Sequence, residues 1–113
     1  MVKTEIVEGN IIFKLEGSQK FLALRRTVKI PLRSIVSIST GTVKPLWFAG
    51  RFGTHIPGFF MAGTFWTRAG KTFYYVRNRS KCITLGLTNH EYKKVVIEVD
   101  SKEEIAKHLR RII

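Results

Sequence analysis

The sequence predicts a mainly β protein of about seven antiparallel strands, in a partly open barrel or sandwich, followed by one C-terminal α-helix. Three observations predict this class. Short apolar runs, spaced about 8 to 12 residues apart, are separated by turn residues as far as residue 99. Several of these runs alternate apolar and polar residues, as half-buried strands do. The last segment instead spaces its apolar residues three to four apart, as an amphipathic helix does.

Length and composition set the limits of this class. The chain has 113 residues, of which 44% are hydrophobic and 12% aromatic, so we expect one domain, 1–113, with a real core. This length excludes a two-domain enzyme with a separate cofactor module. Because Cys82 is the single cysteine, a disulfide scaffold is excluded too. No apolar run long enough for a signal peptide or a membrane-spanning helix is found. We therefore expect a cytoplasmic protein, with peripheral attachment to a membrane as an alternative.

The N-terminal third predicts three strands. Residues 4–7 and 11–15 are β-prone runs separated by Glu8-Gly9-Asn10, a tight turn. Residues 21–30 alternate, with Leu22, Leu24, Val28 and Ile30 on one face and Phe21, Ala23, Arg25, Thr27 and Lys29 on the other. Pro31 cannot donate to a ladder, so we expect it at a strand end or an edge.

The middle of the chain predicts a meander. Residues 35–39 resume the β pattern, and 63–67, 72–76, 82–88 and 94–99 follow as four further strands. Residues 41–63 are rich in glycine and aromatic residues and leave two alternatives open. They form either a long loop with a short strand or two irregular strands with a bulge.

The C-terminal segment predicts a helix. Ser101 is the expected N-cap, and Glu104 is its expected capping-box partner. Ile105, Leu109, Ile112 and Ile113 form one apolar stripe, which must be buried against the sheet.

Four segments carry a resemblance to a known family. They are 30–38 (IPLRSIVSI), 53–65 (GTHIPGFFMAGTF), 70–76 (GKTFYYV) and 82–85 (CITL). Together they resemble bacterial and archaeal PH-like (pleckstrin-homology-like) domains over roughly residues 10 to 113. The resemblance implies a partly open barrel of two near-orthogonal sheets capped by the helix, and a binding or scaffolding module without enzymatic activity.

The resemblance does not extend to phosphoinositide recognition. Lys20, Arg25 and Arg26 lie near the basic motif of the eukaryotic phosphoinositide binders of this family. Thr27 occupies the final basic position of that motif, so the sequence does not predict specificity for inositol phosphates.

Charge is distributed unevenly along the chain. Lys and Arg number 20 against 8 Asp and Glu, a formal net charge of +12. Residues 17–90 contain no acidic residue, so this interval carries the whole excess. A field of one sign attracts polyanions: an anionic lipid surface, an acidic protein partner or nucleic acid. The alternative is that the charge serves only solubility.

Two kinds of segment are candidates for contact with such a partner. Aromatic residues beside Arg51 in 46–52 suit a bilayer interface or stacking on bases, or they fill the core. Residues 77–81 form a basic turn, and Arg25 and Lys29 share the outer face of one strand. The candidate contact residues are Arg25, Lys29, Arg51, Arg77, Arg79, Lys81, Trp47 and Phe48.

No motif predicts catalysis, a cofactor or a metal. The histidines are far apart, HExxH and CxxC are absent, and no serine lies in a GxSxG turn. Cys82 opens a strand, where a small buried thiol is expected. We therefore expect a non-enzymatic binding module. The alternative is a small basic β-barrel that binds nucleic acid through aromatic residues on its strands, a feature that Trp66 and Tyr74 meet.

Overall fold

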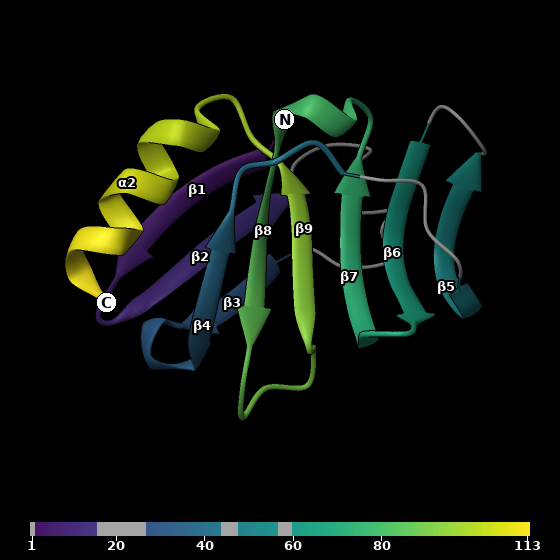
Figure 1. Ribbon diagram of the computed structural model, residues 1–113, viewed down its shortest axis with the longest axis horizontal. Coiled ribbons are helices and arrows are strands. Elements are labelled where there is room, and N and C mark those ends of the chain that lie inside the picture. The colour runs from purple at the N-terminus through teal and green to yellow at the C-terminus, as the bar shows by residue number, and fades with distance from the viewer. Residues whose placement is uncertain (1, 16–26, 44–47, 57–59) are drawn as a thin grey trace.

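The computed structural model describes residues 2–15, 27–43, 48–56 and 60–113 (Figure 1). These residues form two β-sheets and a C-terminal helix, α2 (Lys102–Ile112). The small sheet contains β1 (Val2–Val7), β2 (Asn10–Leu15) and β3 (Thr27–Pro31). The large sheet contains β4 (Ile35–Ser39), β5 (Phe48–Ile56), β6 (Phe60–Thr67), β7 (Gly70–Val76), β8 (Cys82–Leu87) and β9 (Lys94–Glu98). Short 3-10 helices, η1 (Leu32–Ser34) and η2 (Arg79–Lys81), precede β4 and β8. A mainly β protein with a C-terminal helix is thus confirmed.

Residues 27–30 of β3 follow the predicted alternation, and β2 alternates as well. Val7 pairs with Asn10, so only Glu8 and Gly9 form the turn, and both have positive φ, at 49° and 77°. Such two-residue turns match the twist of the strands they join. The residues at alternate positions, Ile11, Phe13, Leu15, Val28 and Ile30, are buried. Pro31 ends β3, as predicted. The predicted strand residues 21–26 lie outside the described residues.

The large sheet has the order β4-β8-β9-β7-β6-β5. Its pairs are antiparallel except for β7 and β9, which are parallel. The prediction of a wholly antiparallel arrangement is therefore wrong. After β7, the chain does not place β8 directly beside β7 but leaves one strand position between them, and β9 then occupies this position. Since β9 is antiparallel to β8, it runs in the same direction as β7. Residues Thr72–Val76 and Val95–Ile97 are buried without alternation, as is typical of parallel strands covered on both faces.

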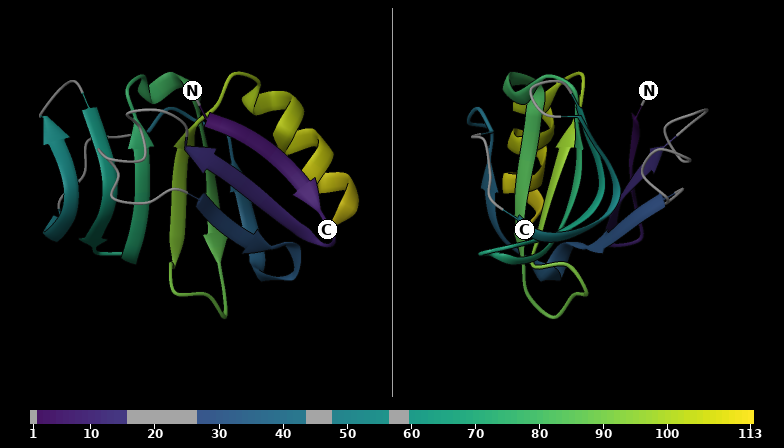
Figure 2. Two further views of the ribbon diagram at one scale, coloured as in Figure 1. Left: turned by 180° about the vertical axis from the view of Figure 1, so that it is seen from behind. Right: turned by 90° about the vertical axis from the view of Figure 1, so that its right-hand side faces the viewer.

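The two sheets are open and do not close into a barrel, so of the predicted partly open barrel or sandwich the barrel is not observed. In the described part of the chain, nine strands are present instead of about seven, and they form two separate sheets. Figure 2 shows the small sheet lying across one face of the large sheet. Strands β5 and β6 extend beyond the small sheet to one side (Figures 1 and 2).

Within residues 41–63, 48–56 form the strand β5 and 60–63 form the start of β6, which favours the alternative of two irregular strands. Strand β5 pairs with β6, and their register shifts between Phe48 and Gly50, which marks a bulge. Gly53 has a φ of 151°, and a Cβ there would collide with the carbonyl oxygen of Ala62 on β6. Only glycine fits this close approach of two backbones.

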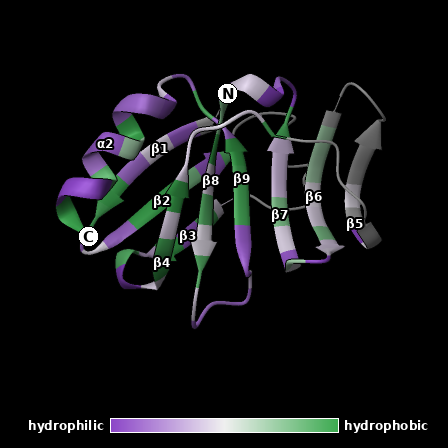
Figure 3. Ribbon diagram, in the orientation of Figure 1, coloured by the Kyte–Doolittle hydropathy of each residue, from purple (hydrophilic) through white to green (hydrophobic). Residues whose placement is uncertain are grey.

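Helix α2 lies along the β1 and β4 side of the molecule (Figures 1 and 2). Ala106 and Leu109 are fully buried in the main core, and Ile105 packs against it. Charged residues cover much of the rest of the helix (Figure 3). The predicted stripe is therefore right only in part, because Ile112 and Ile113 are 44% and 51% exposed. Ser101 is the N-cap, but its side chain makes no capping hydrogen bond, so the predicted capping box with Glu104 is wrong.

The main core lies between the two sheets and α2, and side chains also connect the sheets near the β8–β9 loop. Nε2 of His90 lies 3.1 Å from the carbonyl oxygen of Lys29 on β3, and Nδ1 accepts a hydrogen bond from the backbone N–H of Tyr92. The hydroxyl groups of Tyr92 and Thr64 are 2.9 Å apart. These contacts tie the loop to β3 and to β6.

A second apolar cluster lies on the opposite face of the large sheet. It contains Phe65, Tyr74, Val76, Cys82 and Val96, and the rings of Phe65 and Tyr74 meet edge to face. Among the described residues, no helix is long and apolar enough to cross a membrane.

Candidate functional site

The predicted basic turn, residues 77–81, links β7 to β8 at one end of the large sheet (Figure 1). Its basic side chains are exposed, and η2 contains two of them, Arg79 and Lys81. Of the predicted contact residues, the structure brings together these two and Arg77. The turn is therefore the candidate site that the fold supports best.

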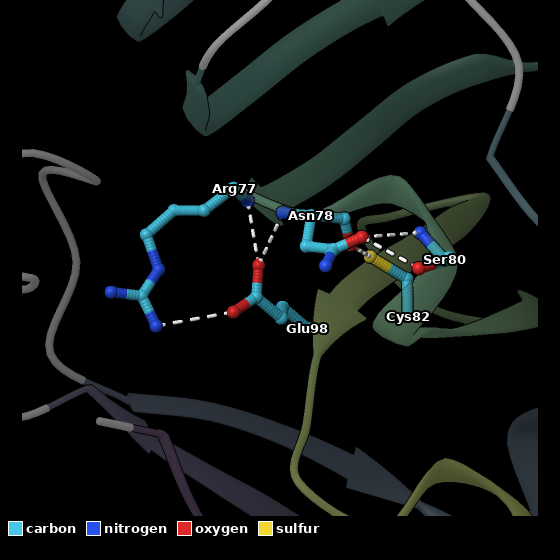
Figure 4. Close-up of polar contacts among 5 residues, drawn as sticks. All are labelled: Arg77, Asn78, Ser80, Cys82 and Glu98. Atoms are coloured by element: carbon cyan, nitrogen blue, oxygen red, sulfur yellow. Dashed lines mark hydrogen bonds and ion pairs between the residues drawn. The ribbon is translucent and has the colours of Figure 1, made fainter.

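One carboxylate holds the start of the turn (Figure 4). Oε1 of Glu98, at the end of β9, accepts hydrogen bonds from the backbone N–H groups of Arg77 at 2.8 Å and Asn78 at 2.6 Å. Oε2 accepts from the Arg77 guanidinium at 3.1 Å. The Glu98 side chain is only 11% exposed, whereas that of Arg77 is 59% exposed. The carboxylate thus binds the backbone of the turn, and Arg77 closes it from the solvent side.

Asn78 holds the turn from within. Its Oδ1 accepts hydrogen bonds from the backbone N–H of Ser80 at 3.0 Å and from the Ser80 hydroxyl at 2.6 Å (Figure 4). The carbonyl oxygen of Asn78 accepts from the N–H of Lys81 at 3.1 Å. A side-chain cap of this kind satisfies the N–H groups that begin a short helix.

Lys102, the first residue of α2, holds the turn from a third side. Its Nζ donates to the carbonyl oxygens of Thr40 and Ser80, each at 2.6 Å. The N–H of Val43 donates to the carbonyl oxygen of Arg79 at 2.9 Å. The turn is therefore fixed to β9, to α2 and to the segment after β4. Most of its backbone polar groups form hydrogen bonds within the protein, while the side chains of Arg79 and Lys81 are exposed.

Cys82 lies directly behind the turn and is buried, as expected. Its Sγ lies 3.4 Å from the carbonyl oxygen of Asn78. The pKa of the Cys82 thiol is raised to about 12, mainly because the thiol is buried. The negative charge of Glu98 also raises this pKa, and the positive charge of Lys102 has a smaller, opposite effect. The group is a protonated thiol at neutral pH, which makes it a poor nucleophile.

The other predicted contact residues lie apart from the turn. Lys29 is exposed on β3, and its carbonyl oxygen contacts His90 in the β8–β9 loop, at the opposite end of β8 and β9 from the turn. Arg51 is exposed on β5. Arg25 and Trp47 lie outside the described residues, and of Phe48 only its backbone place at the start of β5 is described. The described basic residues of the acid-free interval thus occupy several faces.

The sequence indicated the charges of the turn but not the residues that hold it. Glu98 and Lys102 come from segments about 20 residues later, as their hydrogen bonds span 20 to 22 positions. The one available signal was an acidic residue directly after the apolar run 95–97, where an apolar residue would continue the strand.

In the described part of the chain, no group of three His, Cys, Asp or Glu side chains is placed to hold a metal ion. Comparison of the chain with family models, with curated proteins and with solved structures finds no match. The function must therefore be inferred from the site.

Proposed function

We propose that the protein is a non-enzymatic binding module that docks on an anionic lipid surface through its basic turn, residues 77–81. This proposal rests on one observation: the side chains of Glu98, Asn78 and Lys102 form hydrogen bonds with the backbone of the turn and hold it in place. A turn held in this way presents Arg79 and Lys81 without having to be ordered on binding. Preorganisation of this kind increases affinity because it removes an entropic cost.

Electrostatics sets the strength that we expect. Each basic residue close to anionic headgroups contributes about 1 kcal/mol. The charge of Arg77 is partly neutralised by Glu98, so Arg79 and Lys81 supply most of the attraction. Exposed charges are screened within about 8 Å at physiological ionic strength. Binding should therefore be modest, reversible and sensitive to salt.

The proposal extends to the kind of module. Strands followed by one C-terminal helix against the core support the PH-like resemblance. The parallel pair β7–β9 departs from the antiparallel arrangement that this resemblance implies. The docking proposal does not depend on the family, since it stands on the turn alone.

Sedimentation with phosphatidylserine-containing vesicles at low and physiological salt tests the proposal. Neutralising both side chains, in Arg79→Gln/Lys81→Gln, should weaken binding about thirtyfold, the equivalent of two contributions of about 1 kcal/mol. Lys107→Gln/Arg111→Gln is the matched control, because it removes the same charge from exposed positions on α2. The control should bind like the wild type, apart from a small loss from the lower net charge.

Two results would contradict the proposal. Equal losses in the two double variants would mean that net charge, rather than the turn, determines binding. Absence of wild-type binding at low salt would exclude the lipid surface and favour an acidic protein partner instead.

A further inference from the structure

We propose that a second surface binds single-stranded nucleic acid, with a base stacked on Trp66 and its phosphate on Lys71. We call this surface the Trp66 platform, and it consists of Trp66, Lys71, Gly50 and Arg68. The inference does not rest on docking by the basic turn. Lys71 lies near the start of β7 and Arg77 directly follows its end, so the two surfaces occupy opposite ends of this strand.

The position of Trp66 in the sheet leaves its side chain partly exposed to solvent. Thr64, two residues earlier on β6, contacts the core residue Tyr92, so Trp66 lies on the same, core-facing side of the strand. Strands β5 and β6 extend beyond the small sheet (Figures 1 and 2). As a result Trp66 is 43% exposed, although it belongs to the face that elsewhere forms the core.

The Trp66 ring lies next to a glycine of the neighbouring strand β5. Gly50 on β5 is its register partner, and a Cβ at Gly50 would lie 3.7 Å from Cε3 of the ring. The ring therefore lies beside Gly50, and an added methyl group there would be in ordinary van der Waals contact with it. Stacking of a base on an exposed aromatic ring contributes about 1 to 3 kcal/mol per base.

A lysine lies opposite Trp66 on the other neighbouring strand. Lys71 on β7 is the other register partner of Trp66, and directly opposed residues have Cβ atoms about 4.5 to 5.5 Å apart. Nζ of Lys71 lies 5.3 Å from the centre of the Tyr92 ring and 3.7 Å from Oε2 of Glu91. The ion pair with Glu91 is exposed, so it contributes little and leaves Lys71 able to meet a phosphate. Arg68, in the turn after β6, is exposed as well.

This combination favours a nucleic acid strand over a lipid surface. Stacking on Trp66 needs a ligand with an aromatic ring, and Lys71 favours a ligand that carries a negative charge close to that ring. A nucleotide has both. A lipid headgroup offers the charge without the ring.

Fluorescence anisotropy with labelled single-stranded oligothymidylate tests the inference. Trp66→Ala should weaken binding about 5-fold to 150-fold, which corresponds to the loss of one stacked base, and Trp66→Phe should restore most of it. Lys71→Gln should reduce the slope of log affinity against log salt by about 0.7, the value for one phosphate of a single strand. Stacking should also quench the fluorescence of Trp66, so the quenching should be lost in Trp66→Phe.

The same experiment separates this surface from the basic turn. Arg79→Gln/Lys81→Gln should bind the oligonucleotide like the wild type apart from a small loss due to net charge, whereas it should lose vesicle binding. Three results would overturn the inference: no wild-type binding at low salt, wild-type affinity in Trp66→Ala, or loss of vesicle rather than oligonucleotide binding in that variant. Because Trp66 is exposed, circular dichroism of both Trp66 variants should match the wild type.

Discussion

At the scale of single residues, the polar groups around the basic turn work in pairs. Glu98 is almost covered, and it accepts two backbone hydrogen bonds and one from a guanidinium. Bonds to an ionised acceptor are stronger than neutral ones, so a single carboxylate can define the start of the turn. Sequence reasoning found Arg77, Arg79 and Lys81 because their charge is visible in the chain. It missed Glu98 and Lys102 because their role exists only once β9 and α2 are placed beside the turn.

The buried thiol of Cys82 leads to a prediction about alkaline pH. Its pKa is raised by burial from 9.0 to about 12, so above pH 9 the unfolded chain releases this proton while the folded chain keeps it. The unfolded state then binds fewer protons, and the free energy of unfolding falls as pH rises from about 9 to about 12. Burial raises the pKa of Tyr74 from 10.0 to about 12 as well, so its phenol acts in the same direction.

Denaturant unfolding between pH 7 and pH 11 checks this prediction. Wild-type stability should fall above pH 9, and Cys82→Ala should show a smaller fall because Tyr74 alone remains. In the folded wild type, the thiol should react slowly with a thiol reagent at neutral pH and rapidly after unfolding. Rapid labelling of the folded protein would contradict the burial of Cys82.

At the scale of elements, the sequence predicted the strands of the small sheet and the approximate ends of most other strands, but not that the first three strands form a sheet of their own. It did not predict the parallel pair β7–β9. Residues Phe73–Val76 and Val95–Ile97 are buried throughout, and a continuous apolar run carries no signal of direction or neighbour. The sequence did not decide between a loop and the bulged strand β5, because Gly53 allows a close approach to β6 rather than a turn.

Helix α2 allows a direct test of docking. Leu109 is fully buried in the main core, whereas Ile112 on the same helix is 44% exposed. Leu109→Asp places an unpaired charge in an apolar environment and should cost at least about 3 kcal/mol of unfolding free energy. Ile112→Asp is the matched control and should cost less than about 1 kcal/mol. Urea denaturation of the two variants measures the difference, and equal stabilities would mean that the Leu109 side of the helix is not docked.

At the scale of the whole molecule, two open sheets and a helix place two basic surfaces at opposite ends of the large sheet. One is the basic turn, and the other is the Trp66 platform. The acid-free interval of the sequence predicted an attraction for polyanions but not this division, since charge along a chain does not reveal which strands are neighbours. Trp66 and Lys71 are brought together by the β6–β7 hairpin, and the turn is completed by residues from β9 and α2.

The central claim is that the basic turn docks because it is held in place, not only because it is charged. Glu98→Ala and Asp100→Ala test this claim as a pair. Each removes one negative charge, but Glu98 accepts hydrogen bonds from the backbone of the turn, whereas Asp100 is exposed. Charge alone would make both variants bind anionic vesicles at least as tightly as the wild type.

The decisive measurement is therefore the vesicle affinity of these two folded variants at low salt. We predict that Glu98→Ala binds about fivefold to thirtyfold more weakly than the wild type, because about one residue of the turn must then be ordered on binding, at a cost of about 1 to 2 kcal/mol. Asp100→Ala should bind as well as the wild type or slightly better. Tighter binding by Glu98→Ala, to the same degree as by Asp100→Ala, would contradict the claim and leave net charge as the whole explanation.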